Sequence, residues 1–101
     1  MLYDGNNPIL KIVGVERVCW KSGVFDVKAR DYSALAFRIS GNTTITADGK
    51  EYYIRSNDIL YLPQKVSYKV EYVDTEILVI HFITSRDDKE LEVYSFQNVE
   101  K

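Results

Sequence analysis

The side chains that could do chemistry in this chain are few and stand far apart. Arg38 carries guanidinium donors suited to a carboxylate, a phosphate or a polyol. Tyr68 could stack on a sugar or a ring and donate a hydrogen bond from its hydroxyl. His81 is the only histidine and could act as a pH-sensitive group. Cys19 is the only cysteine and has no histidine or acid clearly paired with it, which favours a structural role.

No catalytic motif accompanies these residues. The chain contains no G-x-S-x-G, no glycine-rich phosphate loop and no H-E-x-x-H. A catalytic function would therefore rest on analogy between folds, and a fold does not determine a function. We expect a protein that binds a small molecule and is not an enzyme.

The size and the charge of the chain narrow the class of protein further. The 101 residues are enough for one core and one domain, and 46% of them are hydrophobic. A net charge of -2 with no basic stripe argues against DNA binding by this chain alone. A single cysteine excludes an intramolecular disulfide and is typical of a reducing compartment. With no signal peptide pattern and no long apolar run, we expect a cytoplasmic protein without a membrane partner.

Short runs rich in Val, Ile, Thr, Tyr and Phe recur between turn residues, so the chain is predicted to be all-β. Asp48-Gly49 predicts a two-residue type I′ hairpin, because both central positions of that turn need positive φ. Residues 73–76 predict another tight connection, and residues 91–96 predict a last strand or the start of a helix. The eight expected strands cover residues 9–18, 24–28, 34–40, 43–47, 50–55, 59–62, 66–73 and 76–83.

The order of motifs between Ala29 and Phe82 resembles a known family. The motifs are Arg30-Asp31-Tyr32, Phe37-Arg38-Ile39-Ser40-Gly41, Asp48-Gly49-Lys50, Asn57-Asp58-Ile59-Leu60-Tyr61-Leu62-Pro63 and Val79-Ile80-His81-Phe82. Together they resemble the cupin barrel, and more closely the N-terminal sensor domain of AraC-type transcription regulators. The resemblance implies a cupin-like, jelly-roll antiparallel β-barrel that contains a small-molecule site.

The resemblance also implies which positions would hold a metal in other cupins. Those four ligand positions fall on Lys28, Arg30, Ala34 and Tyr68. A metal site with N and O ligands needs several converging histidines or carboxylates, which these residues do not supply. We therefore expect no metal and no other cofactor.

Cupin ligands point into the barrel, so the resemblance also sets the facing of the strand that contains Arg38. It directs Ala34, Ala36, Arg38 and Ser40 inward. It directs Leu35, Phe37 and Ile39 outward, as an apolar stripe that a second copy or another strand should cover. The alternative, which the residues alone leave open, reverses the two faces and puts Arg38 in solvent.

Seven residues are candidates for the binding site. Arg38 is the expected anchor, and Ser40 shares its face. Lys28 and Arg30 would form a basic rim, or else be solvated loop charges. Tyr68, and less strongly Tyr61, would supply aromatic contact or core packing. His81 would line the pocket, or else be a core histidine hydrogen-bonded to a neighbour.

The function that the resemblance implies is the small-molecule-sensing and dimerisation domain of an AraC-like regulator. The effector would be a sugar or an anionic metabolite, the assembly a homodimer, and DNA would be contacted only by helix-turn-helix units outside this chain. Met1 to Pro8 would be an arm that folds over the pocket. The alternative is a small stand-alone cupin enzyme that acts on a sugar or related metabolite without metal, with His81 and Tyr68 as its acid/base pair.

Overall fold

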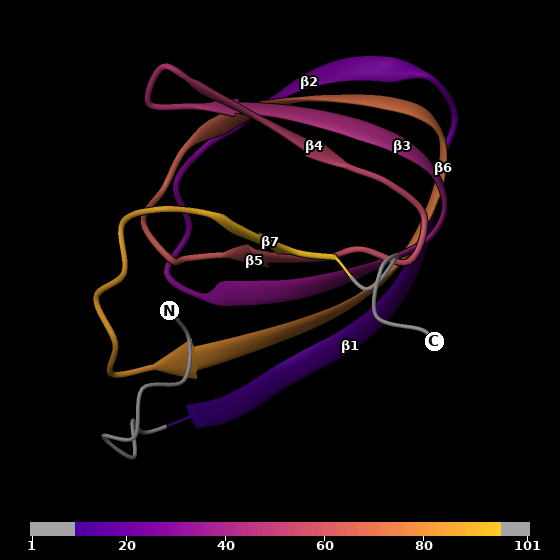
Figure 1. The fold of residues 1–101 in the computed structure, drawn as a ribbon. Helices are drawn as coiled ribbons and strands as arrows, with labels where there is room; N and C mark the ends of the chain where they lie inside the picture. Colours follow the sequence, from indigo (N-terminus) through magenta and orange to yellow (C-terminus); the bar gives the residue numbers. More distant parts are fainter. Residues whose placement is uncertain (1–9, 96–101) are drawn as a thin grey trace.

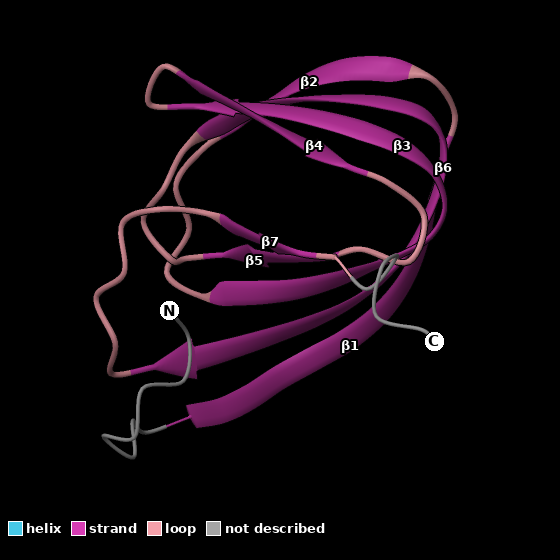
Figure 2. Ribbon diagram, in the orientation of Figure 1, coloured by secondary structure: helices cyan, strands magenta, loops and turns pink. Residues whose placement is uncertain are grey.

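The computed structural model describes residues 10–95, whose seven strands form one antiparallel sheet that curls into a barrel (Figure 1). Within that part of the chain every regular element is a strand (Figure 2), so the all-β prediction is confirmed. The strands are β1 (Leu10–Trp20), β2 (Gly23–Val27), β3 (Ser33–Ala47), β4 (Lys50–Ile54), β5 (Ile59–Leu62), β6 (Tyr68–Thr84) and β7 (Glu92–Tyr94). The proposed arm, Met1 to Pro8, lies outside the described residues.

Two long strands, β3 and β6, hold the barrel together. They pair with each other along most of their length and pass from one layer of the barrel to the other (Figure 1). In one layer the strand order is β1-β6-β3-β5-β7, and in the other β2 pairs with β6 while β4 pairs with β3. The space enclosed between these layers is where a ligand site can form.

The corner where β3 and β6 bend together was predicted incorrectly. We expected separate strands there and a tight connection over residues 73–76, but both strands are continuous. Gly41 has φ 85° and Asp74 has φ 41°, and the pairing shifts register on either side of Ser40. A Cβ at Gly41 would lie 2.2 Å from the Asp74 carbonyl oxygen, so only glycine allows this approach. A bulge thus replaces the expected break.

Two shorter predictions agree with the structure. Asp48 and Gly49 have φ of 52° and 79° and join β3 to β4 at the pair Ala47 and Lys50, which confirms the type I′ hairpin. A last strand forms as β7, which pairs with β5.

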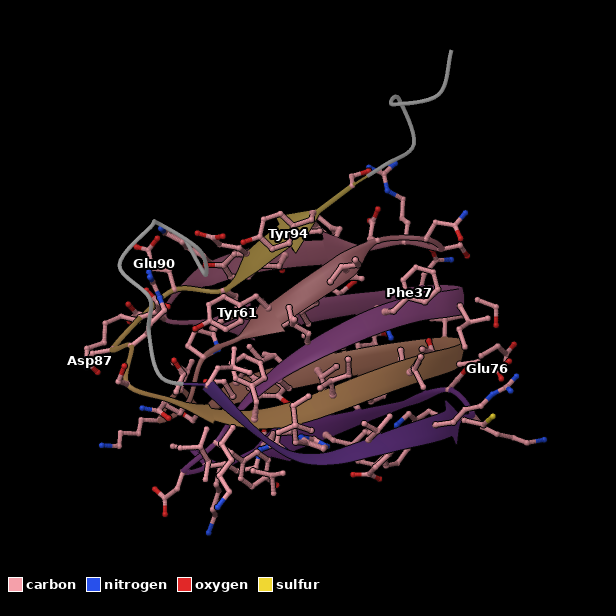
Figure 3. The ribbon with its side chains drawn as sticks, turned by 90° about the horizontal axis from the view of Figure 1, so that it is seen from below. Phe37, Tyr61, Glu76, Asp87, Glu90 and Tyr94 are labelled. Atoms are coloured by element: carbon pink, nitrogen blue, oxygen red, sulfur yellow. The ribbon has the colours of Figure 1, made fainter. Side chains whose placement is uncertain are left out.

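The core fills the inside of the barrel, while a second set of apolar side chains lies on its outer face. Phe37 and Tyr61 belong to that outer face (Figure 3), and the Tyr61 ring stacks against Phe82 with centroids 6.3 Å apart. No helix that could span a membrane occurs among residues 10–95. The inner core comprises Ala34, Ala36, Ile45, Ala47, Ile54, Leu60, Leu62, Val70, Ile77, Val79 and Leu91.

Candidate functional site

A cavity of about 200 Å³ lies inside the barrel, and its shape follows from small residues on β3. Ala34 and Ala36 are 2% and 3% exposed and line it together with Arg38. The predicted inward phase of these three residues is therefore correct, and Phe37 points to the outer face (Figure 3). Because alanine leaves room that a larger side chain would fill, this stretch of β3 creates space. The apolar lining also includes Leu60 and Leu62 of β5 and Ile77 and Val79 of β6, which lie beside these residues on the paired strands, and Ile45.

Arg38 is a buried charged residue inside this cavity. Its side chain is only 1% exposed, and its Nε and Nη1 atoms have no hydrogen-bond acceptor in the described part of the chain. Burial lowers the pKa of Arg38 to about 10, against the opposing effect of the nearby Tyr72 and Asp58. The group is still a cation at neutral pH. An unpartnered buried guanidinium is costly, which is typical of a group that meets its partner in a ligand.

Thr43 adds a second polar group to the cavity lining. Its hydroxyl is buried and also has no hydrogen-bond partner among residues 10–95. It can donate or accept, so together with Arg38 it can serve a ligand oxygen. Thr43 was not among the predicted site residues, because the register shifts near Ser40 change the phase of β3 before it.

Aromatic side chains and Arg30 form another wall of the cavity. Arg30 Nη2 donates to the Tyr68 hydroxyl over 3.0 Å, and its guanidinium lies 5.2 Å from the Tyr32 ring centroid. Burial raises the pKa of Tyr68, although Arg30 opposes that rise. Tyr72 stacks on Trp20 with ring centroids 5.3 Å apart. Arg30 and Tyr68 are thus held in place before any ligand arrives.

His81 lies in the cavity lining beside Glu16. Its Nε2 atom is 3.0 Å from Glu16 Oε2, and Tyr32 packs edge-on against its ring. Nδ1 is buried without a partner in the described region. His81 was predicted either to line the pocket or to be a core histidine hydrogen-bonded to a neighbour. In the structure it lines the pocket and is also hydrogen-bonded to a neighbour. Glu16 was not predicted, because only the pairing of β1 with β6 brings it here.

Three predicted site residues do not line the cavity. Ser40 is exposed in a shallow groove beside Cys19, because the bulge at the corner reverses its phase. Lys28 is exposed beyond the end of β2, in a surface depression with Asp48. Tyr61 alternates with the inward Leu60 and Leu62 and points outward.

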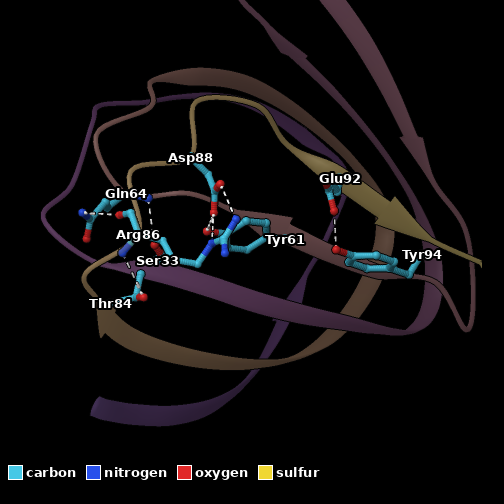
Figure 4. Close-up of polar contacts among 8 residues, drawn as sticks. All are labelled: Ser33, Tyr61, Gln64, Thr84, Arg86, Asp88, Glu92 and Tyr94. Atoms are coloured by element: carbon cyan, nitrogen blue, oxygen red, sulfur yellow. Dashed lines mark hydrogen bonds and ion pairs between the residues drawn. The ribbon is translucent and has the colours of Figure 1, made fainter. Parts of the chain in front are cut away.

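Tyr61 instead anchors the segment that follows β6. Its hydroxyl donates to Asp88 Oδ2 over 2.7 Å, and Arg86 Nε donates to the same oxygen over 2.8 Å (Figure 4). Burial raises the pKa of Tyr61, and the hydrogen bond to Asp88 adds to this effect. The donors from Arg86 and Tyr61 lower the pKa of Asp88 to about 2. This cluster is structural and lies outside the cavity.

The donor set does not fit a cupin metal. The four positions that hold the metal in other cupins are here Lys28, Arg30, Ala34 and Tyr68, and none of these is a histidine or a carboxylate. Among the described residues no three histidine, cysteine, aspartate or glutamate side chains gather as a metal site would require. The polar groups in the cavity are suited to an organic ligand or an anion.

The comparisons with known proteins give the fold. No family model and no curated protein matches the chain. A variant of oxalate decarboxylase from Bacillus subtilis superposes with a TM-score of 0.60 at 15% identity, over 76% of this chain and 22% of that one. The formate complex of the Lactobacillus farciminis enzyme gives 0.57 at 16%, over 84% and 27%. A cupin-2 domain protein from Shewanella frigidimarina gives 0.54 at 16%, over 78% and 74%.

This chain therefore spans about a quarter of the length of the decarboxylases that it resembles. At such low identity the likeness concerns the backbone alone. Together with the seven antiparallel strands it shows that the chain has the all-β cupin fold, a jelly-roll barrel.

Proposed function

We propose that this barrel binds a small anionic molecule and serves as the ligand-sensing and dimerising domain of an AraC-like transcription regulator. The observation that carries the proposal is the unpartnered guanidinium of Arg38 inside an apolar cavity. The order of motifs that resembles AraC-type sensors supports the regulatory part. The lack of ligands at the cupin metal positions favours binding over metal-dependent chemistry.

The free donors of Arg38 point to the class of ligand. The unpartnered Nε and Nη1 groups can each donate a charge-assisted hydrogen bond to a carboxylate or phosphate oxygen, and Thr43 can add a third hydrogen bond. The alanine, leucine and valine walls suit a hydrocarbon part. A solved structure of the same fold is an oxalate decarboxylase formate complex, and this supports a small carboxylate as the ligand. A carboxylate is therefore the preferred effector, ahead of a neutral sugar.

The size of the cavity favours a small effector. A volume of about 200 Å³ is well below the roughly 300–1,000 Å³ of pockets for drug-sized ligands. It corresponds to about six or seven water molecules at ~30 Å³ each. A short aliphatic carboxylate or a small sugar acid fits this volume.

The backbone of Arg38 offers a route from the ligand to the rest of the fold. Its N–H donates to the Asp58 carbonyl over 2.9 Å, and its carbonyl accepts from Asn57 N–H over 2.8 Å. These bonds tie the anchor to the turn before β5, which pairs with β7 near the end of the described chain. A ligand that favours one arrangement of this turn would shift the population of states presented to DNA-binding helices outside this chain.

A binding screen tests the ligand part of the proposal. Thermal shift should be measured with short aliphatic carboxylates, sugar acids, inorganic phosphate and neutral sugars. We expect an anion to stabilise the protein, and Arg38→Met to weaken its binding by about tenfold to a hundredfold, the loss of one or more charged hydrogen bonds. Arg55→Met, at an exposed arginine on the neighbouring turn, is the matched control and should bind normally. Stabilisation by neutral sugars alone, or normal binding by Arg38→Met, would refute the anion site.

The regulatory part has its own test. A reading frame that continues beyond this chain into two helix-turn-helix units would support the sensor. A reading frame that stops after the barrel would refute it and leave ligand binding untouched.

The second candidate is a metal-free cupin enzyme, and the pair of His81 and Glu16 favours it. A carboxylate hydrogen-bonded to an imidazole in a cavity wall is an arrangement that can move a proton. Consumption of a bound carboxylate, followed by NMR, would show turnover. In that case His81→Asn would abolish turnover and retain binding, whereas a pure sensor returns the ligand unchanged.

A further inference from the structure

Strand β1 lies at the border of the sheet, and one of its long sides has no strand beside it in the described chain (Figure 1). It is eleven residues long, and among the described strands β6 is the one that pairs with it. The backbone N–H and C=O groups along its free side can therefore pair with another strand. An edge of this length without proline is a docking surface unless something covers it.

The side chains of β1 are unusually apolar for an exposed edge. Leu10, Ile12, Val13 and Val15 are 50%, 58%, 54% and 59% exposed. The outward stripe that was expected to need a cover is, by contrast, half-buried by its own neighbours, as at Phe37. The apolar surface left open thus lies on β1 more than on β3.

A bulge in β1 determines how two copies of this strand can match. The pairing with β6 shifts between Ile12 and Gly14. As a result Ile12 and Val15, three residues apart, lie opposite Phe82 and Ile80 and share the outer face. Lys11 and Glu16, five residues apart, share the inner face for the same reason, since their partners on β6 are Ile83 and Val79.

We propose that a second copy of this chain pairs with β1 in antiparallel fashion, about a two-fold axis between Val13 and Gly14. In this register Lys11 of each copy faces Glu16 of the other, and Ile12 faces Val15. Residues that face each other across an antiparallel pair lie on the same face of the sheet. Because of the bulge, Lys11 and Glu16 both lie on the inner face and Ile12 and Val15 both lie on the outer face, so both pairs meet this condition. The contact contains two opposite-charge pairs and two apolar pairs, and it is the same from both sides, as a two-fold interface requires.

Neighbouring registers do not give this match. A shift of the axis by half a residue spacing places outer-face residues opposite inner-face ones. A shift by a full residue, to between Ile12 and Val13, sets Lys11 against Gly14 and leaves Glu16 without its opposite charge. The charge pattern of the strand therefore specifies one arrangement.

The interface would also reach the ligand site. Glu16 is the residue that holds His81 Nε2, so Lys11 of the second copy would share a carboxylate that lines the cavity. This inference extends the dimerising role in the proposed function. Its test measures mass and not ligand binding, so either idea can fail while the other stands.

Charge exchange tests the register. Sedimentation equilibrium should show a dimer for the wild-type chain, and Lys11→Glu or Glu16→Lys alone should weaken association by at least about tenfold through like charges facing each other. The double variant should recover the dimer, because the pairs are restored with exchanged signs. Lys69→Glu, at an exposed lysine on β6, is the control and should not change the mass.

A disulfide test does not depend on the strength of association. In a Cys19→Ser background, Ile12→Cys with Val15→Cys should form a covalent dimer under mild oxidation, while Leu10→Cys with Val15→Cys should not. A wild-type monomer at high concentration would overturn the proposal. So would a dimer that Phe37→Asp dissociates and the charge exchanges leave intact, because the contact would then lie on the outer face of β3. Circular dichroism identifies any variant that fails to fold.

Discussion

Tyr61 and Asp88 are 27 residues apart in the sequence, yet the Tyr61 hydroxyl donates to Asp88 Oδ2 over 2.7 Å (Figure 4). Arg86 adds two hydrogen bonds to the same carboxylate, so three donors converge on Asp88. Through this cluster the segment after β6 is fastened to β5, just before it forms β7. The last strand of the barrel is positioned by a charge cluster on its outer side.

The cluster predicts a stability that depends on pH. Because Arg86 and Tyr61 donate to it, Asp88 has a pKa of about 2, below its ordinary 3.8. Asp88 thus takes up a proton less readily in the folded state than in the unfolded state. Its contribution to the free energy of unfolding is complete above about pH 4 and is lost as the pH falls through about 2. Asp88→Asn should lower the free energy of unfolding at neutral pH by about 1–3 kcal/mol, measured by urea denaturation.

The neighbouring aspartate provides a control for that prediction. Asp87 is 74% exposed and forms a surface ion pair with Lys89, so Asp87→Asn should change stability by less than about 0.5 kcal/mol. Equal effects of the two variants would mean that Asp88 has no special role in holding the last strand.

Glycine at the corner of the barrel gives a second prediction. Gly41→Ala would combine a positive φ with a Cβ placed against the Asp74 carbonyl, and should destabilise by more than about 2 kcal/mol. Gly49→Ala has a similar φ but open space around it, so only the backbone penalty of about 1–2 kcal/mol applies. Thermal unfolding of both variants separates the two causes. Equal losses would show that β6 moves aside and that the corner is not tightly packed.

Much of the fold could be predicted from the sequence because strand signals are local. Alternation around Ala34 to Arg38 and the turn pair Asp48-Gly49 each act within a few residues, and both were correct. The bend at Gly41 was mistaken for a break, since a bulge and a turn use the same residue types. The wrong facing of Ser40 follows directly from that error.

The site was only partly predictable, for a different reason. Arg38, Tyr68 and Arg30 line the cavity, but only the resemblance to cupins directed them inward, because the residues alone left the opposite facing open. Glu16 reaches His81 through the pairing of two strands, at residues 65 positions apart in the sequence. The register of that pairing depends on a bulge near Val13, for which Gly14 inside the strand was the only local signal, one that the strand prediction did not use. Distances between strands distant in sequence are set by packing of the whole barrel.

The buried charges near Arg38 give a third prediction. Asp58 is 1% exposed, and its Oδ1 atom, like Nε and Nη1 of Arg38, has no hydrogen-bond partner in the described chain. Replacing both charges, with Arg38→Met and Asp58→Asn together, should raise the free energy of unfolding in ligand-free buffer by about 1–3 kcal/mol. Asparagine can still accept from Arg55 N–H, as Asp58 does over 2.9 Å, so the turn is kept.

Urea denaturation of that double variant distinguishes a binding group from a structural one. A stabilised protein that no longer responds to the anion would show that Arg38 is kept for its ligand at a cost in stability. A clearly destabilised double variant would instead make the guanidinium part of the core.

The last prediction concerns the space that the alanines of β3 leave open. Ala36 is 3% exposed, lines the cavity and lies in register with Val79 and Leu60. Ala36→Leu should fill part of the cavity, so ligand affinity should fall at least about tenfold while stability is kept or rises by about 1 kcal/mol. Ala47→Leu is the matched control, because Ala47 is 4% exposed in the core but does not line the cavity, and overpacking there should cost about 1–3 kcal/mol. Calorimetric titration and thermal unfolding of both variants provide the comparison. If Ala36→Leu is as destabilised as Ala47→Leu, the barrel has no usable space at Ala36, and if it binds the anion as the wild type does, the ligand site lies elsewhere.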